Sequence, residues 1–286
     1  MRLKIEHRSV LHFEAPVVEQ HCELRLKPRE DKYQRLLSHR LEIDPKVQVF
    51  EYADAYGNRV QSFAIIPPHQ RLEIHFSAEL ESYLENPFDF VPPSPAEEQG
   101  QLKGLLKQSP RLLDFVLSRS ERTPDLAAEA LAAACPAFDP AKNFLPQIQA
   151  AMAWIQASLK YLPESTEVHH PLAEVLGAGA GVCQDFSHLL IALLRGWGIP
   201  ARYVMGYQYL AEARERSAAT HAWTEAYLPA VGWRGFDATT GLLADATYLP
   251  VAVGRDSRDA APHRGCYKGG AAGLPPEVDL QVASAQ

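Results

Sequence analysis

Residues 181–197 constrain the fold of this chain more than any other segment. Their apolar residues recur at the spacing of a helix buried along one stripe: Phe186, Leu189, Leu190, Leu193, Leu194 and Trp197. A flexible run of glycine and alanine precedes this helix at 177–181, and glycine and proline follow it at 198–200. Both helix ends are therefore well defined, and Cys183 lies at the start, at the head of the buried stripe.

A cysteine at a helix start lies in an unusual electrostatic environment. The first backbone N–H groups of a helix have no partner within it, and the helix macrodipole is positive at that end. Both effects favour a thiolate over a neutral thiol at Cys183. Asp185, in the first turn, would disfavour a second anion close by. We therefore expect the Asp185 side chain to point away from the sulfur.

Charge and hydropathy exclude several classes of protein. The chain has 286 residues, of which 47% are hydrophobic and 22% charged, so two globular domains of about 100 to 200 residues are expected. A net charge of −7 without a cluster of lysine and arginine argues against binding of nucleic acid or an anionic membrane. No signal-like apolar segment and no run of about 18 apolar residues is present. The sequence predicts a soluble, cytoplasmic protein and does not indicate an oligomeric state.

The four cysteines do not form a recognisable metal or disulfide pattern. They are far apart and include no C-x-x-C pair: Cys22, Cys135, Cys183 and Cys266. In a reducing compartment at least three of them would be plain thiols. A metal site built from Cys183, His188 and His221 would lack paired ligand spacing. We therefore predict no metal and no cofactor.

The first 85 residues have the pattern of a β domain. Short alternating apolar runs separated by turn signals predict a β-sandwich over residues 1–85. The histidines in this region show no ligand spacing, so we expect them to be structural or solvated: His7, His12, His21 and His39. Residues 86–100 follow as a proline-rich linker, because closely spaced prolines remove donors and oppose helix and central strand.

Residues 101–286 are expected to form a second domain of mixed α+β type. Helical periodicity predicts three helices before the cysteine helix, around 112–116, over 126–134 with Thr123 as N-cap, and over 144–159. The next polar loop carries His169 and His170, for which we expect no functional role. Period-two patterns then predict a strand over 201–210 and a hairpin made of 221–228 and 233–237.

The predicted hairpin can bring a histidine and a carboxylate together. Side chains repeat every two residues along a strand, so His221, Trp223 and Glu225 share one face. A register that places Asp237 on this face brings it close to His221, but the sequence does not fix the register. A cysteine, a histidine and a carboxylate are the parts of a thiol triad. The order Cys183, His221, Asp237 supplies all three.

Four segments of this region carry a family resemblance: Gly-Val-Cys-Gln-Asp-Phe-Ser-His (181–188), Gly-Ile-Pro-Ala-Arg-Tyr-Val (198–204), His-Ala-Trp-Thr-Glu (221–225) and Gly-Trp-Arg-Gly-Phe-Asp-Ala-Thr (232–239). Together they resemble the bacterial transglutaminase-like cysteine proteins. Residues 23–29 and 54–58 are similar to the β-rich domain that precedes the core in that group. The resemblance implies a papain-like α+β core, in which the cysteine helix packs on an antiparallel sheet.

The resemblance also implies roles for individual residues. It makes Cys183 the nucleophile, His221 the base and Asp237 the carboxylate that orients the base. Two positions depart from family patterns. Ala238 stands where the common core pattern has proline, a conformational aid without a chemical role. Gln184 stands where animal transglutaminases usually have tryptophan, and this weakens any transfer of cross-linking activity to the chain.

Other residues near these segments are candidates for supporting roles. An oxyanion needs hydrogen-bond donors, for which the Cys183 N–H and the side chain of Tyr161 are candidates. Trp223 and Tyr207 are candidates to line the acyl slot, with core packing as the alternative for both. Glu225 and His188 are expected to be structural: Glu225 as a partner on the strand face, and His188 as a packing residue some 140° around the helix from the cysteine.

The function expected from this reading is acyl chemistry on a peptide or protein amide, with a thioester formed on Cys183. If water resolves the thioester, the protein is a cysteine peptidase or amidase, which we favour. If an amine resolves it, the protein is a protein-glutamine transglutaminase. A third possibility is a catalytically silent module that binds peptides. The residues of the acyl step do not distinguish water from an amine.

Overall fold

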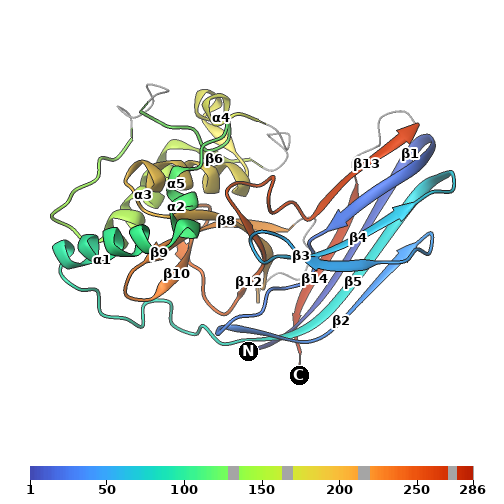
Figure 1. The fold of residues 1–286 in the computed structure, drawn as a ribbon, viewed down its shortest axis with the longest axis horizontal. Coiled ribbons are helices and arrows are strands. Elements are labelled where there is room, and N and C mark those ends of the chain that lie inside the picture. The colour runs from blue at the N-terminus through green and yellow to red at the C-terminus, as the bar shows by residue number, and fades with distance from the viewer. Residues whose placement is uncertain (128–134, 163–169, 212–219, 270–275, 286) are drawn as a thin grey trace.

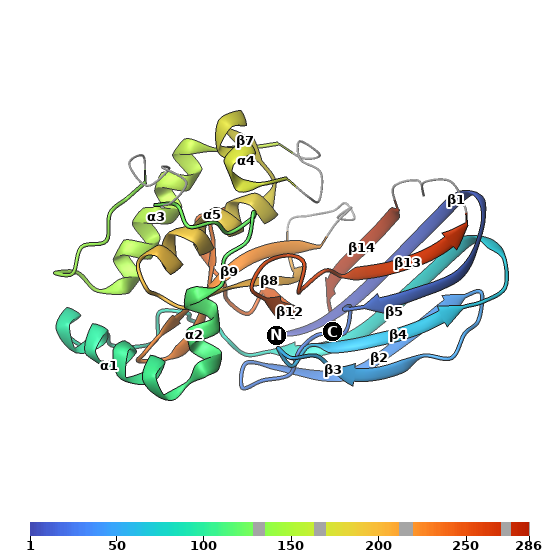
Figure 2. The ribbon, with the colours of Figure 1, turned by 45° about the horizontal axis from the view of Figure 1, so that its top comes forward.

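The computed structural model describes residues 1–127, 135–162, 170–211, 220–269 and 276–285. A sheet-rich part and a mixed α+β part lie side by side, and the two chain ends lie close together at the sheet-rich part (Figures 1 and 2). The α+β class and the sheet-rich N-terminal region agree with the prediction. The predicted helix over 126–134 lies almost entirely outside the described residues, as does His169.

The sheet-rich part is built around one long strand. Its strands are β1 (Arg2–Leu24), β2 (Gln34–Asp44), β3 (Phe50–Ala53), β4 (Arg59–Ile65) and β5 (His69–Ser82), in the order β2-β5-β1-β4-β3. The first half of β1 pairs with β5 and the second half with β4. Buried and less buried residues alternate along β5, as expected for a sheet with one face in a core.

Two strands from the end of the chain complete this sheet. Strands β13 (His263–Gly269) and β14 (Glu277–Ser284) both pair antiparallel with β1. Neither strand was predicted from the sequence, and a division into residues 1–85 and 101–286 does not account for them, because a local pattern does not identify the partner of a strand. The sheet-rich part therefore contains both ends of the chain (Figure 1).

The proline-rich segment ends earlier than predicted. Residues 86–94 contain neither helix nor strand, but helix α1 spans Pro95–Gln108, so the linker prediction is wrong for 95–100. Proline is tolerated at the first helical position, because its missing N–H would have no partner there. The Glu97 carboxylate also accepts a hydrogen bond from the Ser94 N–H at 3.0 Å, which caps the helix start.

The mixed part places helices against a five-stranded antiparallel sheet. Four helices precede all five strands of this sheet in sequence: α2 (Pro110–Leu117), α3 (Phe144–Ser158), α4 (Leu172–Ala178) and α5 (Cys183–Gly196). The sheet has the order β11-β10-β9-β8-β12, with β8 (Ala201–Gln208), β9 (His221–Leu228), β10 (Gly232–Asp237), β11 (Leu242–Leu243) and β12 (Tyr248–Gly254). Helix α5 packs on β9, where the Thr224 hydroxyl donates to the Ser187 carbonyl at 3.0 Å. The predicted cysteine helix and hairpin are thus present.

A buried arginine at the end of α5 connects several elements. Arg195 is 2% exposed, and its guanidinium donates to the carbonyl oxygens of Phe115, Ser118, Ala201 and Arg255 at 2.7 to 3.1 Å. Burial lowers the pKa of Arg195 to about 10, so it remains charged at neutral pH. The Arg195 side chain therefore links helix α2, the start of β8 and the end of β12 through hydrogen bonds.

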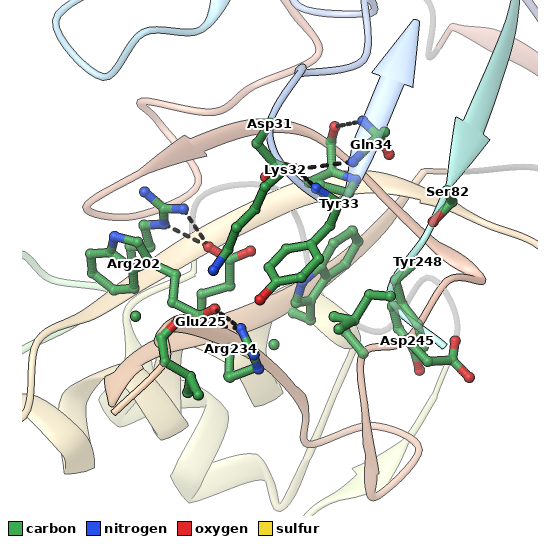
Figure 3. A pocket seen from close by; sticks show the side chains of 18 residues that line it. Asp31, Lys32, Tyr33, Gln34, Ser82, Arg202, Glu225, Arg234, Asp245 and Tyr248 are labelled. Carbon is green, nitrogen blue, oxygen red and sulfur yellow. Dashed lines mark hydrogen bonds and ion pairs between the residues drawn. The ribbon is translucent and has the colours of Figure 1, made fainter. Parts of the chain in front are cut away.

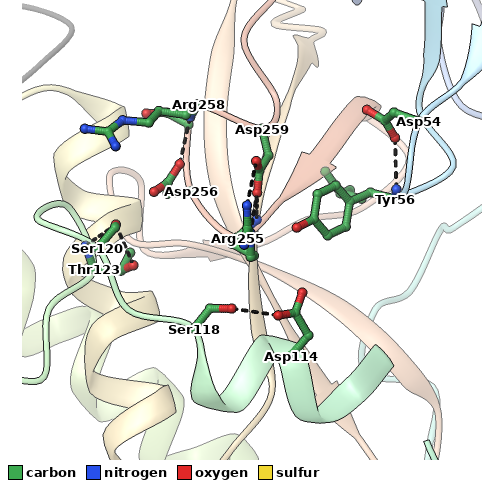
Figure 4. A network of polar contacts seen from close by, with 12 residues as sticks. Asp54, Tyr56, Asp114, Ser118, Ser120, Thr123, Arg255, Asp256, Arg258 and Asp259 are labelled. Atoms are coloured by element: carbon green, nitrogen blue, oxygen red, sulfur yellow. Dashed lines mark hydrogen bonds and ion pairs between the residues drawn. The ribbon is translucent and has the colours of Figure 1, made fainter. Parts of the chain in front are cut away.

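The two parts of the molecule are joined by specific hydrogen bonds. The buried amide of Asn58 donates to the Val253 carbonyl at 2.8 Å and accepts from the Val253 N–H at 2.8 Å, as a strand partner would. Next to it, the guanidinium carbon of Arg255 lies 5.8 Å from the centroid of the Tyr56 ring. Figure 4 shows these two residues facing each other above α2. The turn between β3 and β4, which carries Tyr56 and Asn58, is thereby fixed on the edge strand β12.

Candidate active site

Cys183 is the first residue of α5, and the residues before it explain its position. The Asp185 carboxylate turns back and accepts a hydrogen bond from the Val182 N–H at 2.8 Å, so it satisfies an N–H group before the helix start. A Cβ on Gly181 would lie 2.8 Å from both Cβ and Oδ2 of Asp185. Only glycine leaves room for this arrangement. The segment 181–185 therefore fixes the helix start that presents the cysteine.

His221 and Asp237 are brought together by the hairpin register. Phe236 of β10 lies opposite Thr224 of β9, so Asp237 falls on the same sheet face as His221, as the triad prediction requires. His221 Nε2 lies 2.8 Å from Asp237 Oδ2, and Asp237 is completely buried. The imidazole Nδ1 is then the ring nitrogen left for a thiol.

The electrostatics of this pair favour its charged form. Burial of the ring lowers the pKa of His221, but hydrogen bonds and charge interactions with Asp237 and Cys183 outweigh burial and raise it to about 10. Burial raises the pKa of Asp237, but the contacts with His221, Thr240 and Tyr248 outweigh it and hold the pKa below its ordinary value. An imidazolium beside Cys183 stabilises a thiolate.

Two residues that sequence reasoning missed also hold the carboxylate. The hydroxyl groups of Thr240 and Tyr248 each donate to Asp237 Oδ2 at 2.9 Å, while the Thr239 N–H donates to Oδ1 at 2.9 Å. The sequence held a signal for the turn after Asp237, because an aspartate in a turn often accepts a hydrogen bond from the backbone N–H two residues later. Tyr248 lies on another strand, and its contact with Asp237 could not be read from local spacing.

Tyr161 lies beside the cysteine. Strands β6 (Lys160–Tyr161) and β7 (Ala180–Gly181) pair in parallel, with Tyr161 opposite Gly181. Its ring centroid lies 6.2 Å from that of Phe186 in the first turn of α5. Burial raises the pKa of Tyr161, and the charges of Cys183 and Asp237 add to this. Its position fits the predicted oxyanion donor, and that role stays a prediction.

The two predicted acyl-slot residues pack inside the protein. Tyr207 is fully buried, and its hydroxyl donates to the Leu26 carbonyl and contacts His7 Nδ1, each at 3.2 Å. It therefore joins the two parts of the molecule and has no surface left for a substrate. Trp223 is 1% exposed, and its ring centroid lies 6.1 Å from that of His221. For both residues the structure favours core packing, the alternative to a role in the acyl slot.

The remaining candidates have structural contacts. Glu225 forms an ion pair with Arg202 at 2.6 Å, as expected for a strand-face partner. His188 is buried and accepts a hydrogen bond from the Ser257 N–H at 3.2 Å, and burial holds its pKa well below the ordinary value. Within the described ranges, no group of three or more metal-ligating side chains could hold an ion.

Comparison with known sequences identifies families and relatives that this chain matches. Residues 132–238 match the transglutaminase-like superfamily, and residues 3–81 match the bacterial transglutaminase-like N-terminal region. An uncharacterised protein of Mycobacterium leprae is 31% identical over 289 residues, with 98% of each chain covered. An uncharacterised protein of Mycobacterium tuberculosis is 30% identical over 288 residues, covering 92% of this chain and 87% of its own.

A solved structure has the same fold. A candidate cysteine protease from Cytophaga hutchinsonii superposes with a TM-score of 0.77 at 22% identity, covering 100% of this chain and 92% of its own. At this identity the likeness concerns the fold. None of the helices in the described part of the chain is long and apolar enough to cross a membrane.

Proposed function

Because the chain belongs to the transglutaminase-like superfamily, we propose that it is a thiol-dependent hydrolase of amide bonds that uses Cys183, His221 and Asp237. One observation carries the proposal. The His221 and Asp237 side chains bond at 2.8 Å beside a cysteine at a helix start, and the contact with that cysteine helps to raise the pKa of the imidazole. This arrangement has the parts of an activated thiol nucleophile.

The proposed acylation step uses these three residues. The Cys183 sulfur, as a thiolate, attacks the carbonyl carbon of an amide and forms a C–S bond. The imidazolium of His221 gives its proton to the amide nitrogen, the C–N bond breaks, and an amine leaves. The acyl group remains on the sulfur as a thioester, and His221 is left neutral.

Deacylation reverses the proton movement. Neutral His221 takes a proton from a water molecule, whose oxygen attacks the thioester carbonyl. The C–S bond breaks, the acid is released, and the thiolate and imidazolium are restored. Asp237 keeps the imidazole in one orientation and stabilises its charged form throughout.

Donors near Cys183 would stabilise the negative oxygen that develops on the carbonyl. The N–H of Cys183 is free of intrahelical bonding at the first position of α5, and the Tyr161 hydroxyl is the side-chain candidate. Half of Tyr161 is exposed, at 49%, so it borders solvent where a peptide or protein substrate would enter. We propose such an amide as the substrate. The cytoplasmic location expected from the sequence stays a prediction, which cell fractionation can test.

Product analysis tests the proposal. Glutamine-containing peptides are incubated with the protein, with and without a primary amine such as putrescine, and products are identified by mass spectrometry. We expect hydrolysed peptide or deamidated glutamine in both cases, and loss of product with Cys183→Ala. Peptide–amine adducts that dominate over hydrolysis would instead support the transglutaminase alternative. No acyl product under either condition would support the silent peptide-binding module.

A further inference from the structure

A cavity of about 290 Å³ lies between the sheet-rich part and the mixed part, on the far side of Trp223 and Tyr248 from the candidate active site. Both rings line the cavity. Trp223 also contacts His221, and the Tyr248 hydroxyl reaches Asp237. Neither Cys183, His221 nor Asp237 belongs to the cavity wall, so the cavity is separate from the site of acyl chemistry.

The cavity is fixed in shape by the loop that closes it. The Gln34 side chain donates to the carbonyl oxygens of Arg29 at 2.6 Å and Pro250 at 3.1 Å. The Arg29 N–H donates to the same Pro250 carbonyl at 3.0 Å. The loop before β2 is therefore bonded to edge strand β12, and the cavity needs little rearrangement before it binds a ligand.

Two cations converge on one wall of the cavity. The Lys32 Nζ lies 4.6 Å and the Arg234 Cζ 5.1 Å from the centroid of the Tyr33 ring, and Figure 3 shows the Tyr33 hydroxyl directed between them. Burial raises the pKa of Tyr33, but hydrogen bonds from these two cations outweigh it and lower the pKa. Within the described ranges neither cation pairs with a carboxylate.

The carboxylates of the wall each accept hydrogen bonds from the protein. Glu225 pairs with Arg202 at 2.6 Å. Asp31 accepts from the Tyr33 N–H at 2.7 Å, and Asp245 accepts from a backbone N–H of its own loop at 2.8 Å. Arg234 Nη1 donates to the Trp233 carbonyl at 3.1 Å, whereas its buried Nε has no hydrogen-bond partner among the described residues. The Arg234 Nε–H, the Lys32 ammonium and the Tyr33 hydroxyl are therefore the donors that a ligand can use.

The floor of the cavity is apolar and closely packed. It is formed by the rings of Trp223 and Tyr248 together with Gly235 and Ala244. A Cβ on Gly235 would lie 2.4 Å from the Ala244 Cβ and 3.1 Å from Trp223 Nε1, so this floor is closely packed. Apolar and aromatic walls with a few convergent polar groups are typical of small-molecule sites.

We propose that this cavity binds a small carboxylate that carries an aromatic or similarly flat apolar group. The carboxylate accepts hydrogen bonds from Lys32, Arg234 and the Tyr33 hydroxyl, as anions do from convergent charged donors. The apolar group lies against the partly exposed apolar residues of the wall, Leu84, Val231 and Trp233. A cationic ligand would lie beside two cations, and a neutral one would offer their donors a weaker acceptor than a carboxylate does.

Calorimetry with hippurate, an aromatic carboxylate, tests the site in the full chain. Hippuramide, which has the same shape without the charge, is the ligand control. Hippurate should bind with a dissociation constant below about 10 mM, and hippuramide at least about tenfold more weakly, as expected for loss of a charge-assisted hydrogen bond.

Variants locate the binding. Arg234→Gln and Lys32→Glu should each weaken hippurate binding about tenfold or more, while Lys103→Gln, on exposed α1, should leave it unchanged. Arg234 is buried, so Arg234→Gln can fail to fold. In that case the variant of the exposed Lys32 tests the proposal alone. Absence of hippurate binding, equal binding of hippuramide, or unchanged affinity in Lys32→Glu would each overturn the proposal.

Discussion

Asp237 accepts hydrogen bonds at both of its carboxylate oxygens, and this fixes the histidine more firmly than an isolated pair would. Its Oδ2 accepts from His221, Thr240 and Tyr248 at 2.8 to 2.9 Å, and its Oδ1 accepts from the Thr239 N–H at 2.9 Å. A carboxylate held in this way cannot rotate without losing several bonds. The imidazole orientation is therefore set by the turn after β10 and by Tyr248 on β12.

Replacing Asp237 with asparagine should disable the proposed reaction while keeping the side-chain shape. An amide in this position favours the wrong imidazole tautomer, so kcat should fall about a thousandfold or more. Tyr248→Phe, which removes one of the bonds to Asp237, should lower kcat by only about tenfold. Steady-state kinetics on a cleaved peptide measures both. Equal activity of Asp237→Asn and the wild type would contradict the role of the pair.

Gly181 should tolerate no side chain. A Cβ there would lie 2.8 Å from the Asp185 side chain, so Gly181→Ala should lower the free energy of unfolding by about 1 to 3 kcal/mol. Gly104→Ala is the matched control, because nothing lies within 4 Å of its added Cβ. In the interior of α1 it should instead stabilise by up to about 1 kcal/mol. Urea denaturation compares the two, and equal effects would refute the close packing at 181.

The ionised histidine should make the free energy of unfolding decrease as the pH rises above neutrality. The pKa of His221 is raised from 6.5 to about 10, so its contribution is complete below pH 6.5 and is lost as the pH rises through about 10. The pKa of Asp237 is lowered from 3.8, so its contribution is complete above pH 3.8 and is lost at lower pH. Both contributions are complete between these two values.

The measurement is the difference in free energy of unfolding between wild type and His221→Ala across this range. We expect the difference to be largest near pH 5 to 6 and to fall by at least about 1 kcal/mol towards pH 10. A difference that grows with rising pH would mean that the histidine is neutral in the folded protein.

At the scale of elements, the end of α5 is held by Arg195 as firmly as its start is held by Asp185. Arg195 donates to four backbone carbonyl groups on three other segments. Arg195→Met should keep much of the packing but leave those carbonyl groups unpaired, and lower the free energy of unfolding by about 3 kcal/mol or more. Arg111→Met, at an exposed position of α2, should change it by less than about 0.5 kcal/mol. Chemical denaturation of both variants provides the test, and comparable losses would contradict this account of Arg195.

Elements with strong local periodicity could be predicted from the sequence, and elements defined by distant partners could not. The apolar stripe from Phe186 to Trp197 predicts α5, and alternation around the turn at 229–232 predicts the hairpin of β9 and β10. The start of α1 at Pro95 was missed, because several prolines in succession obscured the one that begins a helix. Strand pairing of β13 and β14 with β1 carries no local signal.

The same distinction applies to the candidate site. Cys183, His221 and Asp237 could be proposed from residue type, strand period and family resemblance, and the hairpin register brings the last two together. Tyr248 could not be found, because it reaches Asp237 from a separate strand. Tyr207 was proposed as a candidate for the acyl slot, with core packing as the alternative. Only the three-dimensional arrangement shows that its hydroxyl points to Leu26 in the sheet-rich part.

At the scale of the whole molecule, the sheet-rich part and the mixed part form one structure with shared hydrogen bonds. Asn58 and Gln34 bond to β12, His7 contacts Tyr207, and β13 and β14 return the chain to β1. The strand that carries Tyr248 is therefore anchored on both sides. The sheet-rich part supports the candidate site through β12 rather than by contributing residues to it.

The central claim is that Cys183 is an activated thiolate. It is tested most directly by mapping iodoacetamide alkylation of each cysteine near pH 6 by mass spectrometry, with the exposed Cys266 as internal reference. We predict that Cys183 is alkylated at least about tenfold faster than Cys266, and that His221→Ala removes most of this difference. Alkylation of Cys183 no faster than that of Cys266 would contradict the account.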